Sequence, residues 1–332
     1  MKKSHLVTGL AFAIVSALFV FSCSTLKELA LSPSVSLEKV SIASVDLEGI
    51  TFNCNYAVSN PLPVGISIKN VAADILYNES KFTSLSADDG IKLVAGGKNS
   101  NAFNFKVPYE TILSFAKGSG ETNGKYLPFK INGKVSLDLG TSAIVQGLAS
   151  DLPFSMNFNV PVFKPSFSVS NPQVQLPSLE SIQNSLVSSG MSALKAIALA
   201  GSIVAGTSIA ESALDGINLD IGVKFDLNVA NTGSAPWKYV LNNCSIKTSS
   251  GDAIKLVPEN NTITSSSGTI PVTAKLNTLT AGKFIAQILN KKGSNPVFTF
   301  DSGLTFTELS YAPNLPLSYS KEIAISSFGL AN

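Results

Sequence analysis

Four short segments of this chain recur in the same order in its second half, and this internal repeat constrains the fold more than any single residue. The recurring pairs are residues 33–37 with 165–169, 47–50 with 214–217, 58–60 with 229–231, and 152–155 with 315–318. A duplicated domain is the simplest explanation. The spacing between the copies jumps by about 35 residues after the first pair and then stays nearly steady, so we expect one insertion in the second copy, at about 177–213.

The N-terminus has the pattern of an export signal. Lys2, Lys3 and His5 precede an apolar run over residues 6–21, which is typical of a signal peptide. The run ends in Val20-Phe21-Ser22-Cys23, which resembles the lipobox of bacterial lipoproteins, although Phe21 replaces the usual small residue. The resemblance implies a signal peptide over 1–22, a lipid such as palmitate on Cys23, and a tether over 23–32. An uncleaved anchor helix is the alternative, and both tether the chain to a membrane.

The same resemblance bears on location. Ser24 follows the cysteine, where an aspartate would favour retention in the inner membrane of many Gram-negative bacteria. We therefore expect a protein of the cell envelope, anchored by its lipid to the outer membrane and facing the periplasm.

The charged residues exclude several function classes. The chain has 24 lysines, 22 acids and no arginine, and its only histidine is His5. Removal of Lys2 and Lys3 with the signal leaves 22 lysines against 22 acids, and a neutral surface does not attract nucleic acid. Without imidazole or guanidinium, the mature chain also lacks the usual groups for acid-base work, metal binding and capture of anions. We expect no enzyme, no catalytic residue, no metal and no cofactor.

Two cysteines, Cys54 and Cys244, remain after Cys23. When the two copies are aligned on the four recurring segments, these cysteines do not fall at equivalent positions. Two buried thiols that act as small apolar residues are one reading, and a single interdomain disulfide in an oxidising compartment is the other.

Most of each copy alternates apolar and polar residues with a period of two, as in strands with one buried face. One short helix is expected in each copy, over 108–116 and 280–289. This pattern predicts two tandem antiparallel β-sandwiches, immunoglobulin- or fibronectin-like, over 33–164 and 165–332.

Trp237, beside a turn, is either an exposed contact or a packed turn residue. Six phenylalanines are expected in the first core, with a ligand cavity as the alternative: Phe103, Phe105, Phe115, Phe129, Phe154 and Phe158.

The strand that ends in Asn60-Pro61, the following strand with Val71, the lone helix and the last strand led by Leu-Pro together resemble a known family. This is the water-stress and hypersensitive-response (WHy) domain of late-embryogenesis-abundant proteins of the group 2 type. The second copy matches less well, because Asn231 is followed by threonine. The resemblance implies a non-catalytic protective role under envelope stress or desiccation, and the alternative is a carrier that holds a lipid or other apolar ligand in the sandwich.

Asn60, Pro61 and Asn231 have two interpretations. They can form the rim of a binding surface, or they can shape a turn, since asparagine bonds its own backbone and proline fixes the bend. We favour the turn.

The insertion predicts two helices. Residues 178–187 have apolar side chains three and four apart after a serine cap, and residues 191–210 are apolar almost all round. We expect a helical hairpin packed on the sandwiches, with two alternatives, a surface that contacts lipid or a protein client, and a membrane span. The expected partners are therefore the membrane, reached through the N-terminal lipid, and a lipid or protein client.

Overall fold

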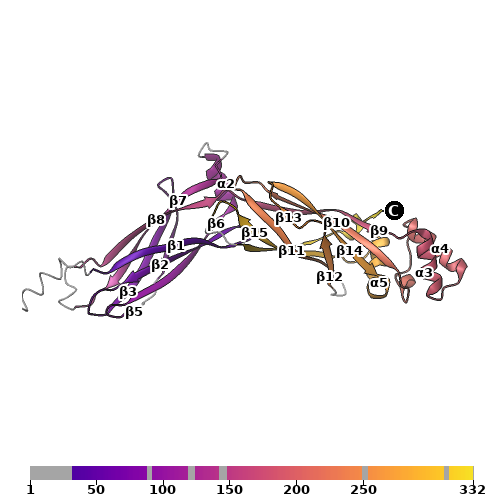
Figure 1. Ribbon diagram of the computed structural model, residues 1–332, viewed down its shortest axis with the longest axis horizontal. Coiled ribbons are helices and arrows are strands. Elements are labelled where there is room, and N and C mark those ends of the chain that lie inside the picture. The colour runs from indigo at the N-terminus through magenta and orange to yellow at the C-terminus, as the bar shows by residue number, and fades with distance from the viewer. Residues whose placement is uncertain are drawn as a thin grey trace, which may run out of the picture. The chain divides into compact units, whose positions relative to one another are not determined.

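The computed structural model describes residues 32–87, 92–118, 124–141, 148–248, 253–309 and 314–331. The predicted signal peptide and the lipidated Cys23 lie outside these residues. The described chain is mainly β, arranged in several sheets with four α-helices (Figure 1).

The N-terminal half, as we use the term, comprises the elements from the first strand to the last strand before Pro165. Its strands are long and alternate buried with exposed side chains, as the period of two predicted. Its elements are β1 (Ser34–Val45), β2 (Gly49–Ser59), β3 (Ile66–Tyr77), β4 (Ser80–Ala87), β5 (Lys92–Leu93), β6 (Lys98–Pro108), α2 (Tyr109–Gly118), β7 (Tyr126–Asp138) and β8 (Asp151–Pro161).

The C-terminal half begins with the next strand and contains the remaining helices. Its elements are β9 (Pro165–Gln175), α3 (Leu179–Ser188), α4 (Ala193–Val204), a 3₁₀ turn (Glu211–Leu214), β10 (Asp220–Asn231), β11 (Trp237–Lys247), β12 (Ala253–Pro258), β13 (Thr262–Ile263), β14 (Ser267–Asn277), α5 (Thr278–Leu289), β15 (Val297–Phe306), β16 (Leu315–Glu322), a second 3₁₀ turn (Ile325–Ser327) and β17 (Gly329–Ala331).

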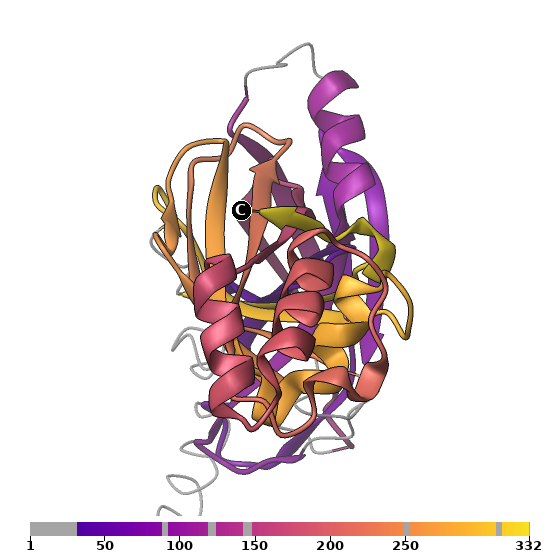
Figure 2. The same cartoon turned by 90° about the vertical axis from the view of Figure 1, so that its right-hand side faces the viewer.

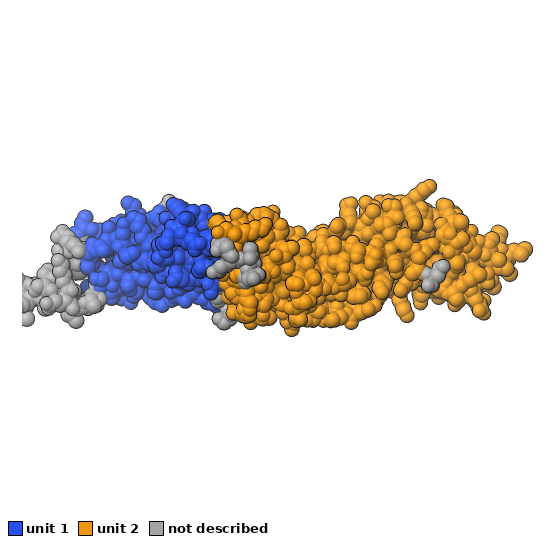
Figure 3. Space-filling view, turned by 90° about the horizontal axis from the view of Figure 1, so that it is seen from above, with its two compact units in different colours: residues 1–41, 52–105, 127–160 blue, residues 42–51, 106–126, 161–332 orange. Residues whose placement is uncertain are grey.

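The chain divides into two compact units (Figure 3). Unit 1 contains residues 1–41, 52–105 and 127–160, and unit 2 contains residues 42–51, 106–126 and 161–332. Helix α2 therefore belongs to unit 2, although it lies in the N-terminal half of the sequence.

Two separate sheets make up the N-terminal half. One has the strand order β1-β2-β6, and the other has the order β4-β3-β7-β8, with β5 also paired to β3. Asn78 and Glu79 connect β3 to β4 with positive φ angles of 47° and 59°, the conformation that suits a two-residue hairpin.

One sheet of nine strands makes up the C-terminal half. Its order is β16-β15-β11-β12-β14-β10-β9-β17, with β13 also paired to β11. The segment β9-β10-β14 has the order of β1-β2-β6, and β12-β11-β15-β16 has the order of β4-β3-β7-β8. Pairing of β12 with β14 joins these segments, and β17 adds a parallel strand on β9.

Aromatic side chains fill the space between the sheets of unit 1. Phe52 and Phe105 from the smaller sheet contact Phe158 from the larger one, with ring centroids 5.4 and 5.8 Å apart. Phe129 and Phe154 are buried as well, whereas Phe103 and Phe115 are only half-buried. The six phenylalanines expected in this core are therefore buried at four positions.

The C-terminal core also consists of packed aromatic rings. Phe167 contacts Phe300 with centroids 5.0 Å apart, and Phe225 contacts Phe328 at 5.5 Å. Trp237 is buried, and its indole N–H donates to the carbonyl of Ser265 at 2.9 Å. Of the two interpretations of this tryptophan, the packed turn residue is correct.

Both predicted helices of the insertion are present, and they lie side by side (Figure 2). Ser178 caps α3 as expected, because its hydroxyl accepts a hydrogen bond from the N–H of Ser181 at 3.2 Å. The second helix is shorter than the expected 191–210. It ends at Val204, and Gly206 follows with a φ of +65°, a conformation that suits glycine and terminates helices.

Candidate functional site

Asn60 is fully buried at the end of β2, and its side chain holds the turn that follows. Its amide nitrogen donates to the carbonyls of Val64 (2.8 Å) and Val94 (3.0 Å), and its oxygen accepts from the N–H of Leu62 (3.2 Å). Pro61, which is half-buried, directly follows the asparagine. The amide is therefore used to satisfy backbone groups in the turn.

Asn231 makes the same kind of turn at the end of β10. Its amide nitrogen donates to the carbonyl of Ala235 (3.0 Å), and its oxygen accepts from the N–H groups of Gly233 (2.8 Å) and Lys164 (3.1 Å). Both asparagines thus bond the carbonyl four residues ahead and the N–H two residues ahead. The turn persists without a proline at position 232, because the asparagine side chain supplies the bonds that define it.

A hydroxyl at the first residue of α2 fixes this helix to the segment before β2. The Tyr109 hydroxyl donates to the carbonyl of Asp46 at 2.8 Å, and the Tyr109 N–H donates to the carbonyl of Glu48 at 2.9 Å. Burial, with a smaller contribution from the Asp46 charge, raises the pKa of Tyr109 well above its ordinary value. The phenol therefore stays protonated and serves as a structural donor.

Helix α5 is fixed by the same two bonds. The Thr278 hydroxyl donates to the carbonyl of Ile217 at 2.6 Å, and the Thr278 N–H donates to the carbonyl of Leu219 at 2.9 Å. Asp46 and Ile217 are therefore structural equivalents. The sequence similarity of 47–50 with 214–217, which aligns Ile50 with Ile217, is out of register with the structure.

The two described cysteines are free thiols, and both are buried. Burial raises the pKa of Cys54 to about 12 and that of Cys244 to about 11. Since the thiolate is the reactive form, these side chains act as small apolar residues, the first of the two readings of the sequence.

Charged side chains in the described residues form ion pairs on the surface. Lys106 contacts both Asp46 and Glu48 at 2.8 Å. Burial works to raise the pKa of Asp46, but the hydrogen bonds from Lys106 and from the N–H groups of Glu48 and Gly49 together hold it below the ordinary value. Other pairs are Lys81–Asp74, Lys98–Glu38, Lys125–Glu308 and Lys134–Asp151. In the described part of the chain, no group of three or more potential ligands could hold a metal ion.

A small opening, lined by apolar and polar side chains, lies between β4 and β6, the facing edges of the two sheets of the N-terminal half. It has a volume of about 120 Å³. Its buried wall consists of Tyr56, Val71 and Ala73, and Phe103 is half-buried beside them. The remaining lining residues are Leu85, Ser86, Ala102 and Asn104. Phe103, expected in the core or along a ligand cavity, therefore lines a cavity.

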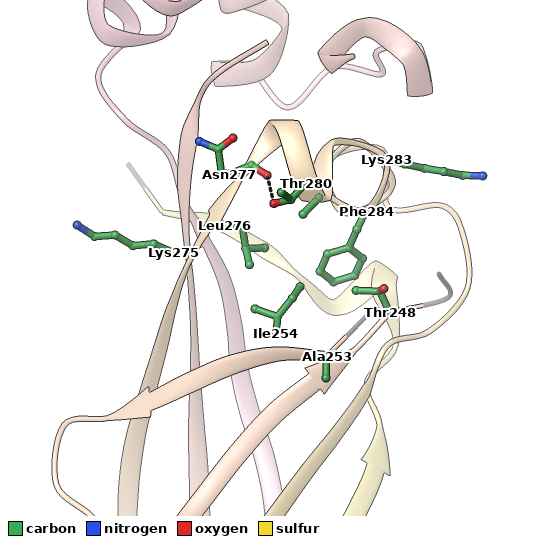
Figure 4. Close-up of a pocket in the computed structure, with 10 residues that line it drawn as sticks. Thr248, Ala253, Ile254, Lys275, Leu276, Asn277, Thr280, Lys283 and Phe284 are labelled. Carbon is green, nitrogen blue, oxygen red and sulfur yellow. Dashed lines mark hydrogen bonds between the residues drawn. The ribbon is translucent and has the colours of Figure 1, made fainter. Parts of the chain in front are cut away.

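A larger cleft of about 590 Å³ lies beside α5 (Figure 4). Ile254, Leu276 and Phe284 form its apolar wall, whereas the side chains of Lys275 and Lys283 extend away from it. Residues 249–252 lie next to its lining residues in the sequence but outside the described part of the chain, so we assign no ligand to this cleft.

The hairpin of α3 and α4 has a buried side and an exposed apolar side. Ala196, Ala200 and Ile203 are fully buried. On the outer side of α4, Leu194 is 83% exposed and Ile197 is 55% exposed. None of the helices that the structure describes has the length and apolar character needed to cross a membrane.

Comparisons with known proteins gave only distant structural matches. No family model and no curated protein matches the chain. A crystal structure of a protein from Archaeoglobus fulgidus is 14% identical and covers 38% of this chain and 97% of its own, with a TM-score of 0.29. The solution structure of a putative late embryogenesis abundant protein is 16% identical over 48% of this chain and 89% of its own, with a TM-score of 0.30. A solution structure from Arabidopsis thaliana is 15% identical over 39% and 82%, with a TM-score of 0.30.

Proposed function

We propose that this protein is a membrane-anchored, non-catalytic lipoprotein built from two tandem β-sandwiches of the WHy type. Its role is to protect envelope proteins during desiccation or related stress by binding apolar surface that they expose when partly unfolded. Cys23 carries the lipid, and the protein faces the periplasm from the outer membrane.

The recurring architecture supports the tandem arrangement. The order β1-β2-β6 recurs as β9-β10-β14, and β4-β3-β7-β8 recurs as β12-β11-β15-β16. The asparagine turns and the hydroxyl bonds of α2 and α5 recur at the same places. Two unrelated domains would not share these details, so we infer a duplication.

One observation carries the binding role: the exposed apolar side of α4. Leu194 and Ile197 are three positions apart on one helix and therefore lie on the same face. Side chains exposed this far leave apolar area in water, and we infer that the two form part of a contact surface. A client that exposes apolar surface under stress would cover it.

The test is a protection assay with the full-length protein in membrane vesicles. A drying-sensitive enzyme is dried and rehydrated with the vesicles, and its recovered activity is measured. We expect the double variant Leu194→Ser with Ile197→Ser to lose most of the protection. Val257→Ser is the matched control, because Val257 is 60% exposed but lies on strand β12 and not on the hairpin.

Equal protection by wild type and by the double variant would contradict the role of α4. Failure of the wild type to protect better than empty vesicles would contradict the protective function itself.

The anchor has its own test. Cys23→Ala should abolish lipidation and release the protein from the membrane fraction or stall its processing. A mutant that still fractionates with membranes after signal cleavage would contradict the lipoprotein assignment.

The alternative function, a carrier for an apolar ligand, is favoured by the opening between β4 and β6. The two functions are separable, since this opening and α4 belong to different units.

A further inference from the structure

The two halves differ at one pair of facing strands, which is β12 and β14 in the C-terminal half and β4 and β6 in the N-terminal half. In the C-terminal half, β12 pairs with β14 through Val257 opposite Thr273 and Pro258 opposite Val272. The N–H of Glu259 extends this pairing with a 2.9 Å hydrogen bond to the carbonyl of Pro271. This edge is closed by the chain's own backbone.

The equivalent residues of the N-terminal half can be assigned from the pairing of neighbouring strands. Leu85 lies opposite Ala73 on β3, as Leu256 lies opposite Cys244 on β11. The next residue along, Ser86, is therefore the counterpart of Val257.

The other side of the edge follows from the helices. Strand β6 continues directly into α2 at Tyr109, and β14 continues directly into α5 at Thr278. Counting back from these helices makes Asn104 the counterpart of Thr273, and Phe103 the counterpart of Val272.

Among the described residues, β4 and β6 belong to separate sheets, and the 120 Å³ opening lies at the position where β12 and β14 pair. Ser86, Phe103 and Asn104 are among its lining residues. The duplicated fold therefore closes this edge in one half and leaves it open in the other.

We propose that the opening binds the hydrocarbon end of a neutral amphiphile, with the uncharged polar head held at Ser86 and Asn104. The inference rests on the carrier alternative of the proposed function and names its site and its ligand class. Two observations select this occupant: the volume of the opening and its uncharged, partly apolar lining.

The volume fits the end of one aliphatic chain, since an apolar protein cavity of roughly 150 Å³ accepts benzene. Apolar and aromatic side chains share the wall with the polar Ser86 and Asn104, and none of the residues that line the opening carries a charge, so a charged head would gain no partner there.

An added peptide strand fits the edges less well. Lys81 lies on β4, and Lys98 and Lys106 lie on β6. Lysines on edge strands oppose the addition of another strand.

The experiment is photolabelling of the full-length protein in its own membrane. The probe is hexan-1-ol that carries an aliphatic diazirine, and mass spectrometry maps the labelled residues. We expect labelling on β4 and β6 around Ser86 and Phe103, and little around Val257 and Thr273 in the closed half. Hexan-1-ol should compete with the label, whereas hexane-1,6-diol, which has no apolar end, should not.

Two variants test the site itself. Ala73→Leu fills the opening and should remove most of this labelling, while Ala72→Leu adds the same atoms on the opposite face of β3 as the matched control. Leu85→Ala enlarges the opening and should extend labelling to longer alcohols, so the proposal stays testable if Ala73→Leu folds poorly.

Labelling spread evenly over both halves, or labelling that Ala73→Leu and Ala72→Leu reduce equally, would overturn the proposal. Neither outcome would affect the protection assay with the α4 variant, which tests the other function.

Discussion

The N-terminal and C-terminal halves share a strand order and two sets of anchoring hydrogen bonds, but they treat one edge differently. Strands β12 and β14 pair at two residue positions, whereas their counterparts β4 and β6 leave a small opening. Both halves keep the asparagine turns and the helix attachments although their facing edges differ. The proposed ligand site arises where the facing edges do not pair.

The C-terminal half also carries the additional elements. Helices α3 and α4 lie between β9 and β10, and β17 pairs in parallel with β9.

The largest predicted effect lies in the insertion that only the C-terminal half possesses. Ala200→Glu places a charge at a fully buried position of α4 and should lower the free energy of unfolding by about 3 kcal/mol or more. Ala198→Glu, an exposed position on the same helix, is the control and should change stability little. Thermal unfolding measures both, and equal melting temperatures for the two variants would show that the hairpin is not packed as described.

The asparagine turns should respond alike in the two halves. Asn60→Ala and Asn231→Ala each remove three hydrogen bonds to backbone groups and should each cost about 2–3 kcal/mol. Urea unfolding of the two variants measures the loss. A large cost for one and none for the other would mean that the turns are not equivalent.

Asn101, on β6, offers a substitution that should raise stability, because the C-terminal half has an apolar residue at the equivalent position. Its amide nitrogen is buried and has no hydrogen-bond partner within the part of the chain that the structure describes, and its counterpart in β14 is the buried Ile270. Asn101→Ile should therefore stabilise the protein by about 1 kcal/mol, because it removes an unsatisfied donor. A destabilised variant in urea unfolding would indicate that this amide has a bound partner in solution.

The smallest predicted effect is the loss of stability at low pH that comes from Asp46. Asp46 has a lowered pKa in the folded protein, whereas its counterpart Ile217 cannot titrate. The stability from this carboxylate is complete above the pKa of an unfolded aspartate, about 3.9, and is lost as the pH falls through the lower folded value. Asp46→Asn should therefore show a smaller decrease in melting temperature than wild type between pH 7 and pH 2. An unchanged decrease would show that the interactions of Asp46 contribute nothing measurable.

Much of the architecture could be predicted from the sequence because the alternation of apolar residues and the asparagine turns are local signals. Asn60 and Asn231 were found this way, as were α3 and the helix after Pro108. The similarity of 47–50 with 214–217 misled, because the bonds that define the register involve backbone carbonyls, which any residue supplies. The length of α4 depended on a positive φ at Gly206 that composition does not reveal.

The open edge could not be predicted from the sequence. Whether two edges pair depends on how the sheets approach each other, and Ser86 and Val257 are both acceptable strand residues. For the same reason, nothing local in the three residues of β17 predicted its parallel pairing with β9.

Disulfide trapping tests the central claim, that one edge is closed and its counterpart is open, most directly. Residues opposite each other in an antiparallel pair lie within the Cα separation that a disulfide requires. We predict that Val257→Cys with Thr273→Cys forms a disulfide readily under mild oxidation, and that Ser86→Cys with Asn104→Cys does not. Equally rapid formation of both disulfides, or formation only in the Ser86 and Asn104 pair, would contradict the account.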